Sequence, residues 1–187
     1  VDKVLIFDDA AALCGNSPVK VEDFLDWDWV GAAWKWGVEG SPYALGGNGA
    51  LSLRSRHLML RVVSDAVQAG ELTVPTKMNE DMWFMKTIFS RRGELDARLA
   101  PRNVSTAWAI EELFSEKPFG VYHLMRTVPT VLRDRVIKFC PEAKRLFEAL
   151  PPRPLPGTPT ASKKRCSVAS SYTAACCLDG EIEHNSA

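Results

Sequence analysis

The sequence predicts an α/β fold, on the strength of three observations. Short apolar runs suited to strands alternate along the chain with stretches whose apolar residues recur at helical spacing. Every predicted strand is short and apolar, as in a sheet that helices cover on at least one face. A chain of 187 residues, 46% of them hydrophobic, is also long enough to bury one sizeable core. We therefore expect a single α/β domain.

Three strands are predicted in the first third of the chain. Val4 to Phe7 (VLIF) has the pattern of a buried strand, and a polar turn and the short amphipathic stretch VEDFLDW follow it. Trp29 to Trp34 (WVGAAW) has the small and aromatic residues of a second buried strand. After a long loop, Ala50 to Arg54 alternates between apolar and polar residues, so its two leucines should face one side of the sheet.

Helices are predicted further along the chain. The first runs from Ser55 up to Gly70, which serves as its stop. The stretch NEDMWFMKTIFSRRG has the same pattern, with Asn79 as its N-cap and a glycine beyond its end. The stretch VSTAWAIEELF fits a helix and a strand equally well. A last helix is expected from Val131 to Leu150, broken or kinked at Pro141.

The folded domain is expected to cover residues 1–150. From Pro151 onward the chain is rich in Pro, Ser, Thr and Ala and lacks a sustained hydrophobic period. Such a composition cannot bury enough apolar surface to offset the entropy of ordering. We therefore predict that residues 151–187 form a disordered tail.

The charge balance argues against polyanionic partners. Lys and Arg together number 23, as do Asp and Glu, and the basic residues are scattered, so we expect no binding of nucleic acid or of an anionic membrane. No apolar run approaches the roughly 18 residues that span a bilayer, and the chain as given is expected to be soluble. It starts with Val1 and enters an apolar run at once. A preceding segment, with a signal peptide or an anchor for the secretory pathway, is therefore an open expectation.

The five cysteines give an odd count, and three of them lie in the predicted tail. Only Cys14 and Cys140 lie in the predicted domain, and no pair has the CxxC spacing of a zinc site. The sequence thus predicts no disulfide framework and leaves the redox compartment open.

A glycine-rich segment, GGNGALSLRSR, leads into the third predicted strand. Gly46, Gly47 and Gly49 tolerate positive φ and leave the backbone bare, so that another molecule can approach the main chain. Asn48 adds a side-chain amide with donors and an acceptor. A turn that simply feeds a strand explains the same residues. The spacing fits neither a GxGxxG loop nor a Walker loop.

Several local patterns occur in a fixed order: VLIFDDAAALCGNS, DFLDWDWVGAAW, GGNGALSLRSR, NEDMWF, AWAIEELF and PFGVYH. In this order they resemble the DUF5672 family, a glycosyltransferase-like family common in fungi, and the resemblance covers Val4 to His123. It implies a glycosyltransferase A type fold, a Rossmann-like α/β sandwich with a mixed sheet that binds a nucleotide-sugar, often with a divalent metal. The part present resembles the carboxy-terminal half of that fold, so we expect its amino-terminal portion to be absent.

Catalytic roles follow from the resemblance. Sugar transfer with inversion needs a carboxylate that takes the proton of the acceptor hydroxyl. The motif NEDMWF supplies Glu80 and Asp81 at a predicted helix start. By resemblance Asp81 is the base or an acceptor ligand, with Glu80 in support. Alternatively, both carboxylates simply complement the dipole of the helix.

The resemblance also implies a divalent ion such as Mn or Mg, which takes oxygen ligands that a histidine sometimes completes. The family pattern after the first strand resembles F-Q-x-D-S, and Ala10 stands where its aspartate is expected. Asp8 and Asp9 lie one or two residues earlier and could substitute for it if the turn shifts its register, and Asp9 is taken as the candidate ligand. His123 in PFGVYH is the second candidate. Solvated carboxylates and a structural histidine are the alternatives.

Further ligand contacts are expected from four places. The bare backbone of Gly47 to Gly49 would lie against the donor sugar or the acceptor, so that Gly49→Val abolishes ligand binding with little change in melting temperature. Arg54 could pair with a diphosphate, Trp34 could stack on a sugar ring, and Glu111 matches a glutamate in the family pattern F-A-V-E. The alternatives are a surface ion pair for Arg54, a place in the core for Trp34 and a charge on a helix face for Glu111.

The sequence therefore predicts a glycosyltransferase-like domain that transfers a sugar from a nucleotide-sugar to a glycan or another hydroxyl acceptor. Two alternatives stay open. One is a catalytically degenerate module that binds a carbohydrate or a nucleotide-sugar, as Ala10 indicates, and the other is a truncated product without activity. The leading interpretation requires that Asn48, Glu80 and Asp81 face one hollow wide enough for a hexose.

Overall fold

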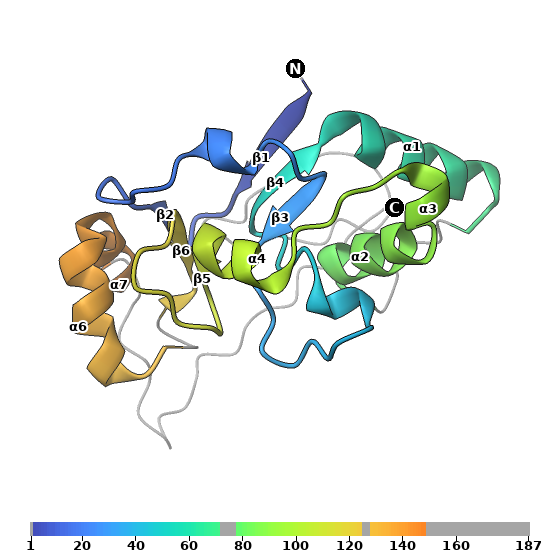
Figure 1. Cartoon of the computed structure of the whole chain (residues 1–187). Coiled ribbons are helices and arrows are strands. Elements are labelled where there is room, and N and C mark those ends of the chain that lie inside the picture. The colour runs from blue at the N-terminus through green and yellow to red at the C-terminus, as the bar shows by residue number, and fades with distance from the viewer. Residues whose placement is uncertain (1, 72–77, 125–127, 149–187) are drawn as a thin grey trace, which may run out of the picture. The chain divides into compact units, whose positions relative to one another are not determined.

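The computed structural model of the chain describes residues 2–71, 78–124 and 128–148 (Figure 1). By their contacts the residues divide into two units, Val1–Pro151 and Pro152–Ala187, and all described residues belong to the first. The tail predicted at 151–187 lies outside the described residues.

One three-stranded sheet is antiparallel throughout. Its central strand is β4 (Leu51–Ser55), which pairs with β1 (Lys3–Phe7) on one side and β3 (Trp29–Gly31) on the other. The leucines of β4 pack into the core, as its alternating sequence predicts. Ser52 and Arg54 take the opposite face, and this face is buried as well.

A second three-stranded sheet mixes both strand directions. β6 (Gly120–Tyr122) lies in its centre, antiparallel to β2 (Ala11–Leu13) and parallel to β5 (Ala109–Ile110). The fold is therefore α/β, as predicted, and it contains two small open sheets where the sequence predicted one mixed sheet.

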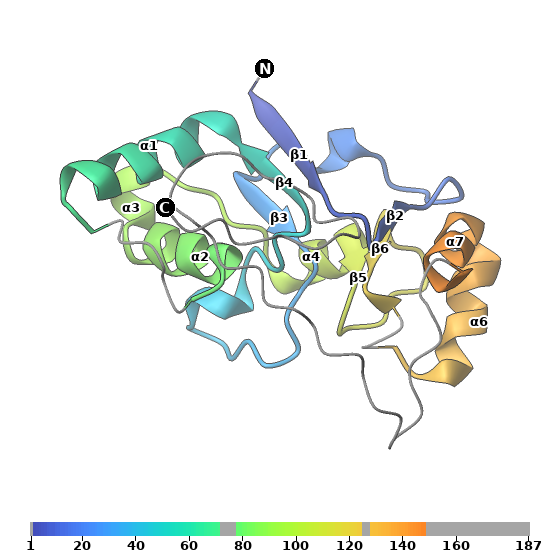
Figure 2. The same cartoon turned by 180° about the vertical axis from the view of Figure 1, so that it is seen from behind.

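Helices pack beside both sheets. In Figures 1 and 2, α1 and α2 lie beside the first sheet, and α6 and α7 lie beside the second. No helix in the described ranges is long and apolar enough to cross a bilayer. The α-helices are α1 (Arg56–Gln68), α2 (Glu80–Ser90), α3 (Arg92–Leu95), α4 (Arg102–Trp108), α6 (Thr130–Phe139) and α7 (Lys144–Glu148), and the 3-10 helices are η1 (Val21–Phe24), η2 (Pro42–Ala44) and η3 (Pro141–Ala143).

The helix predicted from Ser55 to Gly70 is confirmed as α1, which follows β4 without a loop. Ser55 ends the strand in an extended conformation, and its hydroxyl accepts a hydrogen bond from the N–H of Leu58 at 3.4 Å. Gly70 takes a positive φ of 68° beyond the helix end, which is the usual backbone of a helix stop. Asn79 precedes α2 at the predicted N-cap position, although its side chain makes no capping bond.

The structure also answers the two remaining questions about helices, the ambiguous stretch VSTAWAIEELF and the break at Pro141. The stretch that fitted a helix and a strand equally well contains both, since α4 ends at Trp108 and β5 starts at Ala109. The last predicted helix is interrupted where Pro141 was expected to break it. There α6 gives way to η3, and α7 continues from Lys144.

The prediction that β1 is buried is wrong. Its apolar residues Val4, Leu5, Ile6 and Phe7 are between 36% and 53% exposed. The strand lies at the edge of its sheet and pairs with β4 alone. An apolar run predicts a strand from its residues but does not reveal whether other elements cover the two faces of that strand.

The two cysteines of the domain form a disulfide, which the cysteine count did not predict. Cys14 follows β2 and Cys140 follows α6, and their Cα atoms lie 4.7 Å apart. Both side chains are buried in the cluster beside the second sheet. The bond therefore fastens the carboxy-terminal helices to this sheet across 126 residues of sequence.

Candidate functional site

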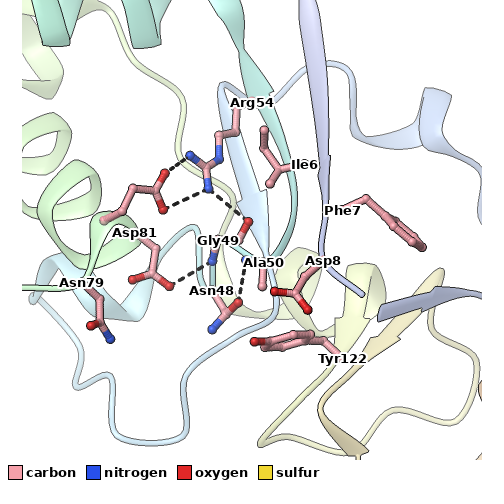
Figure 3. Close-up of a pocket in the computed structure, with 11 residues that line it drawn as sticks. Ile6, Phe7, Asp8, Asn48, Gly49, Ala50, Arg54, Asn79, Asp81 and Tyr122 are labelled. Atoms are coloured by element: carbon pink, nitrogen blue, oxygen red, sulfur yellow. Dashed lines mark hydrogen bonds and ion pairs between the residues drawn. The ribbon is translucent and has the colours of Figure 1, made fainter. Parts of the chain in front are cut away.

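A pocket of about 460 Å³ opens where the glycine-rich segment meets the first turn of α2 and the end of β1 (Figure 3). Its volume lies within the range of roughly 300 to 1,000 Å³ that is usual for small-molecule sites. The structure thus brings together five residues that the sequence singled out. The lining residues are Ile6, Phe7, Asp8, Asn48, Gly49, Ala50, Arg54, Asn79, Glu80, Asp81 and Tyr122.

Arg54 lines the pocket, and each of its three guanidinium nitrogens donates a hydrogen bond within the protein. Both Nη atoms donate to the carboxylate of Glu80, and Nη2 also donates to the carbonyl of Gly49 at 3.0 Å. Nε donates to Ser52 Oγ at 2.9 Å. The guanidinium stacks over the ring of Trp29, 3.8 Å from its centroid. With a side chain only 7% exposed, Arg54 joins β4, the glycine-rich segment and α2.

Asp81 fastens the glycine-rich segment to α2. Its Oδ2 accepts a hydrogen bond from the N–H of Gly49 at 3.0 Å, and its Oδ1 accepts one from the N–H of Met82 at 2.7 Å. A carboxylate oxygen can accept two hydrogen bonds. Asp81 therefore keeps capacity to accept a bond from a hydroxyl in the pocket that it lines.

Asn48 connects the pocket to a carboxyl that lies behind it. Its Oδ1 accepts a hydrogen bond from the N–H of Ala50 at 2.8 Å, and its Nδ2 donates to Oε1 of Glu111 at 3.2 Å. Burial raises the pKa of Glu111 to about 8, and the negative charges of Glu112 and Asp81 add to the rise. Glu111 is thus mostly protonated at neutral pH.

The glycines of this segment are required by packing within the chain. Gly46 and Gly47 have φ angles of 69° and 98°, which favour glycine. A Cβ atom on Gly49 would lie 2.6 Å from Arg54 Nη2 and 2.9 Å from the Cβ of Asp81. The bare backbone at Gly49 therefore admits side chains of the protein itself, and Gly49→Val is expected to lower stability as well as any ligand binding.

Three of the predicted ligand contacts, Gly47, Trp34 and Glu111, do not line this pocket. Trp34 is 5% exposed and belongs to an aromatic cluster, with its ring centroid 5.4 Å from that of Trp36 and 5.7 Å from that of Tyr43. The carbonyl of Gly47 accepts a hydrogen bond from Nε1 of Trp29 at 3.0 Å. Trp34 and Gly47 are therefore engaged in contacts within the protein.

Neither candidate metal ligand lines the pocket, although Asp8 beside Asp9 and Tyr122 beside His123 both do. Asp8 lines the pocket and its Oδ1 accepts a hydrogen bond from the N–H of Ala10 at 2.8 Å, whereas Asp9 is exposed on the turn. His123 has a left-handed φ of 49°, and its N–H donates to the carbonyl of Ala10 at 3.2 Å. Its ring stacks on Tyr122 with centroids 4.3 Å apart.

Within residues 2–71, 78–124 and 128–148, no three His, Cys, Asp or Glu side chains gather into a group that could hold a metal ion.

Tyr122 and Asn79 line the pocket without having been predicted as ligand contacts. Asp8, which was named with Asp9 as a possible substitute for the missing aspartate, lines the pocket, whereas Asp9 does not. Tyr122 was present in the motif PFGVYH, beside the histidine that drew attention. Asn79 was predicted as a helix cap, and its position one residue before Glu80 was the signal that it shares the site.

A family profile described as "Protein of unknown function (DUF5672)" matches residues 1–123. The matched range includes every residue that lines the pocket, as well as Glu111 behind it. No curated protein and no solved structure matches the chain.

Proposed function

The chain belongs to the DUF5672 family, and from this membership together with its pocket we propose that it is a glycosyltransferase-like domain. It transfers a sugar from a nucleotide-sugar to a hydroxyl of a glycan or of another acceptor. The observation that supports this most is that Asn48, Gly49 and Asp81 line one pocket.

The polar groups of the pocket suit a ligand rich in hydroxyls. Carboxylates of Asp8 and Asp81 accept hydrogen bonds, and the amides of Asn48 and Asn79 both donate and accept them. A sugar hydroxyl can take either part in such a bond. Tyr122 adds an aromatic ring at the edge of the pocket (Figure 3), and aromatic faces pack well against the apolar face of a pyranose ring.

The charges of the pocket favour a sugar or acceptor over a diphosphate. Of the lining residues, Asp8, Glu80 and Asp81 are acidic, and only Arg54 is basic. The charge of Arg54 is balanced by Glu80 through their ion pair. A phosphate group would meet the two remaining carboxylates without a free cation, and like charges at close range repel. We therefore assign this pocket to the acceptor, with the diphosphate of the donor outside it.

In the proposed step Asp81 acts as the base. Its carboxylate takes the proton of the acceptor hydroxyl while the hydroxyl oxygen forms a bond to the anomeric carbon of the donor sugar. The bond between that carbon and the diphosphate oxygen breaks, and the diphosphate leaves with the electron pair. The two N–H groups that bond to Asp81 fix the carboxylate for this transfer.

The test is turnover of a panel of nucleotide-sugars by the full chain, with a mixture of methyl hexosides as acceptors, in the presence and absence of Mn. Asp81→Asn should abolish turnover and leave the fold intact by circular dichroism. Asp134→Asn serves as the matched control, because Asp134 is exposed on α6, away from the pocket. Equal turnover in wild type and Asp81→Asn would show that Asp81 takes no part in the chemistry. Turnover that occurs with Mn and is absent without it would show that the metal has a role.

A second candidate function is a carbohydrate-binding module without turnover. It is favoured by the internal bonds of the carboxylates, since Glu80 is paired with Arg54 and both oxygens of Asp81 accept backbone N–H groups. A methyl hexoside that raises the melting temperature, with no nucleotide-sugar consumed, would support this function.

A further inference from the structure

Glu111 is a buried carboxyl with one oxygen that lacks a partner. It directly follows β5, so the short parallel pairing of this strand with β6 sets its backbone position. Its Oε1 accepts the hydrogen bond from Asn48 Nδ2 at 3.2 Å. Its Oε2 is buried and has no hydrogen-bond partner among the residues that the structure describes. A buried ionised oxygen in such a position would be costly.

The groups that face Glu111 make ionisation less favourable still. Glu112 carries a negative charge on the next residue and is fixed there, because its Oε2 accepts a hydrogen bond from the N–H of Lys35 at 2.8 Å. Asp81 contributes a second negative charge from the first turn of α2. The neighbour on the glycine-rich segment is the neutral amide of Asn48. No cation among these groups compensates a charge on Glu111.

Asn48 is held at three points, and Glu111 supplies the last of them. The backbone N–H of Asn48 donates to the carbonyl of Ala32 at 2.8 Å. Its Oδ1 accepts from the N–H of Ala50 at 2.8 Å, which settles which end of the amide carries the oxygen. Of these three hydrogen bonds, only the one from Nδ2 to Glu111 has a side chain as its partner. Loss of this bond leaves the side-chain amide held through Oδ1 and releases its NH₂ end.

We propose that Glu111 is a positioning residue which, as a neutral carboxylic acid, holds the amide of Asn48 in the wall of the pocket and releases it on ionisation. A charged Glu111 would gain free energy by moving toward water and away from Asp81 and Glu112. The contact with Asn48 would then break. The inference concerns regulation of the pocket and rests on the proposed function only where a sugar ligand is concerned.

The first test measures the coupling without any ligand. In the full chain, labelled with ¹³C and ¹⁵N, the carboxyl carbon of Glu111 and the side-chain amide of Asn48 are followed by NMR from pH 3 to pH 10. We expect both signals to titrate with one midpoint near pH 8, as the pKa of Glu111 requires. A midpoint for Glu111 between about 4 and 5, or an Asn48 amide that does not follow Glu111, would overturn the proposal.

Two variants separate positioning from a merely structural effect. Glu111→Gln keeps the shape and cannot ionise, so the Asn48 amide signal should stay constant across the range. Glu112→Gln is the matched control on the adjacent residue. It removes one of the two like charges, so the shared midpoint should move to lower pH while the coupling persists. An Asn48 signal that still titrates near pH 8 in Glu111→Gln would assign the effect to another group.

A ligand arm then connects the inference to the pocket. The probe is a neutral methyl hexoside, whose own charge does not change with pH. If only the protonated form binds, its apparent Kd should rise about thirtyfold between pH 7 and pH 9.5 in wild type and stay constant in Glu111→Gln. A wild-type Kd that is constant with pH contradicts the proposal. Absence of hexoside binding at every pH would count against the proposed function, whereas the NMR titration alone decides the coupling of Glu111 to Asn48.

Discussion

The N–H of Gly49 donates to Oδ2 of Asp81 at 3.0 Å, and this bond ties the glycine-rich segment to the first turn of α2. The two segments are separated by 32 residues of sequence, with β4 and α1 between them. Gly49 also contacts Arg54, because the carbonyl of Gly49 accepts a hydrogen bond from Nη2 of Arg54. A pocket with carboxylates on its wall therefore depends on a residue that has no side chain.

Gly49→Val should destabilise the protein by about 1 to 3 kcal/mol, the usual cost of forcing extra methyl groups into a packed site. The reason is that a Cβ atom there would lie 2.6 Å from Nη2 of Arg54 and 2.9 Å from Oε2 of Glu80. Urea denaturation monitored by tryptophan fluorescence measures the change. Gly93→Ala is the control, since a Cβ atom on Gly93 meets no atom within 4 Å. A Gly49→Val protein as stable as wild type would show that the pocket has room at this point.

Glu80→Gln should cost about 1 to 3 kcal/mol of stability, because it leaves the guanidinium of Arg54 buried beside a neutral amide. The matched control is Glu116→Gln, which breaks the ion pair with Arg135. Both partners of that pair are more than half exposed, at 63% and 56%, so the change should stay within about 0.5 kcal/mol. Chemical denaturation of the two variants in parallel gives the comparison. Equal losses would mean that burial of Arg54 does not strengthen its pair.

Glu111→Gln should stabilise the protein, and the gain should grow with pH. The pKa of Glu111 is raised from 4.5 to about 8 in the folded state, so between these values the folded protein holds a proton that the unfolded chain has lost. Wild-type stability therefore falls as pH rises through this window, by at most about 1.4 kcal/mol per pH unit. The variant lacks this loss. Thermal unfolding at pH 4.5, 6 and 8 should show curves that diverge with pH, and parallel curves would contradict the shifted pKa.

Removal of the disulfide should cost about 2 to 5 kcal/mol, since the bond closes a long loop. The comparison uses Cys14→Ala/Cys140→Ala against wild type in urea, with and without dithiothreitol. Reductant should lower the stability of wild type alone. In a protein with Cys166, Cys176 and Cys177 changed to Ser, a thiol assay under denaturing conditions should find no free thiol, and two free thiols would show that the bond does not form.

Local sequence signals were sufficient where neighbours in the sequence decide the structure. The start of α1 at Ser55 and its stop at Gly70 depend on adjacent backbone groups, and Pro141 interrupts a helix wherever its missing N–H is needed. The motif NEDMWF likewise predicted a helix start with two carboxylates, and both line the pocket.

Features decided by distant neighbours could not be predicted in this way. Arg54 has the same sequence context as an exposed strand residue. Its side chain is buried because Glu80 and Trp29, both distant in the sequence, contact its guanidinium group. The pairing of Cys14 with Cys140 depends on how α6 returns to the second sheet. The exposure of β1 depends on which elements cover its two faces, a property that no residue of the strand encodes.

The bond between Cys14 and Cys140 turns the intervening chain into a covalent ring. Every residue of the pocket except Ile6, Phe7 and Asp8 lies on that ring. A protease that cuts the ring once opens it without separating its pieces, and the nicked protein would run at full length on a gel without reductant. Digests of this protein therefore need to be compared in both reduced and unreduced samples before an uncut chain is inferred.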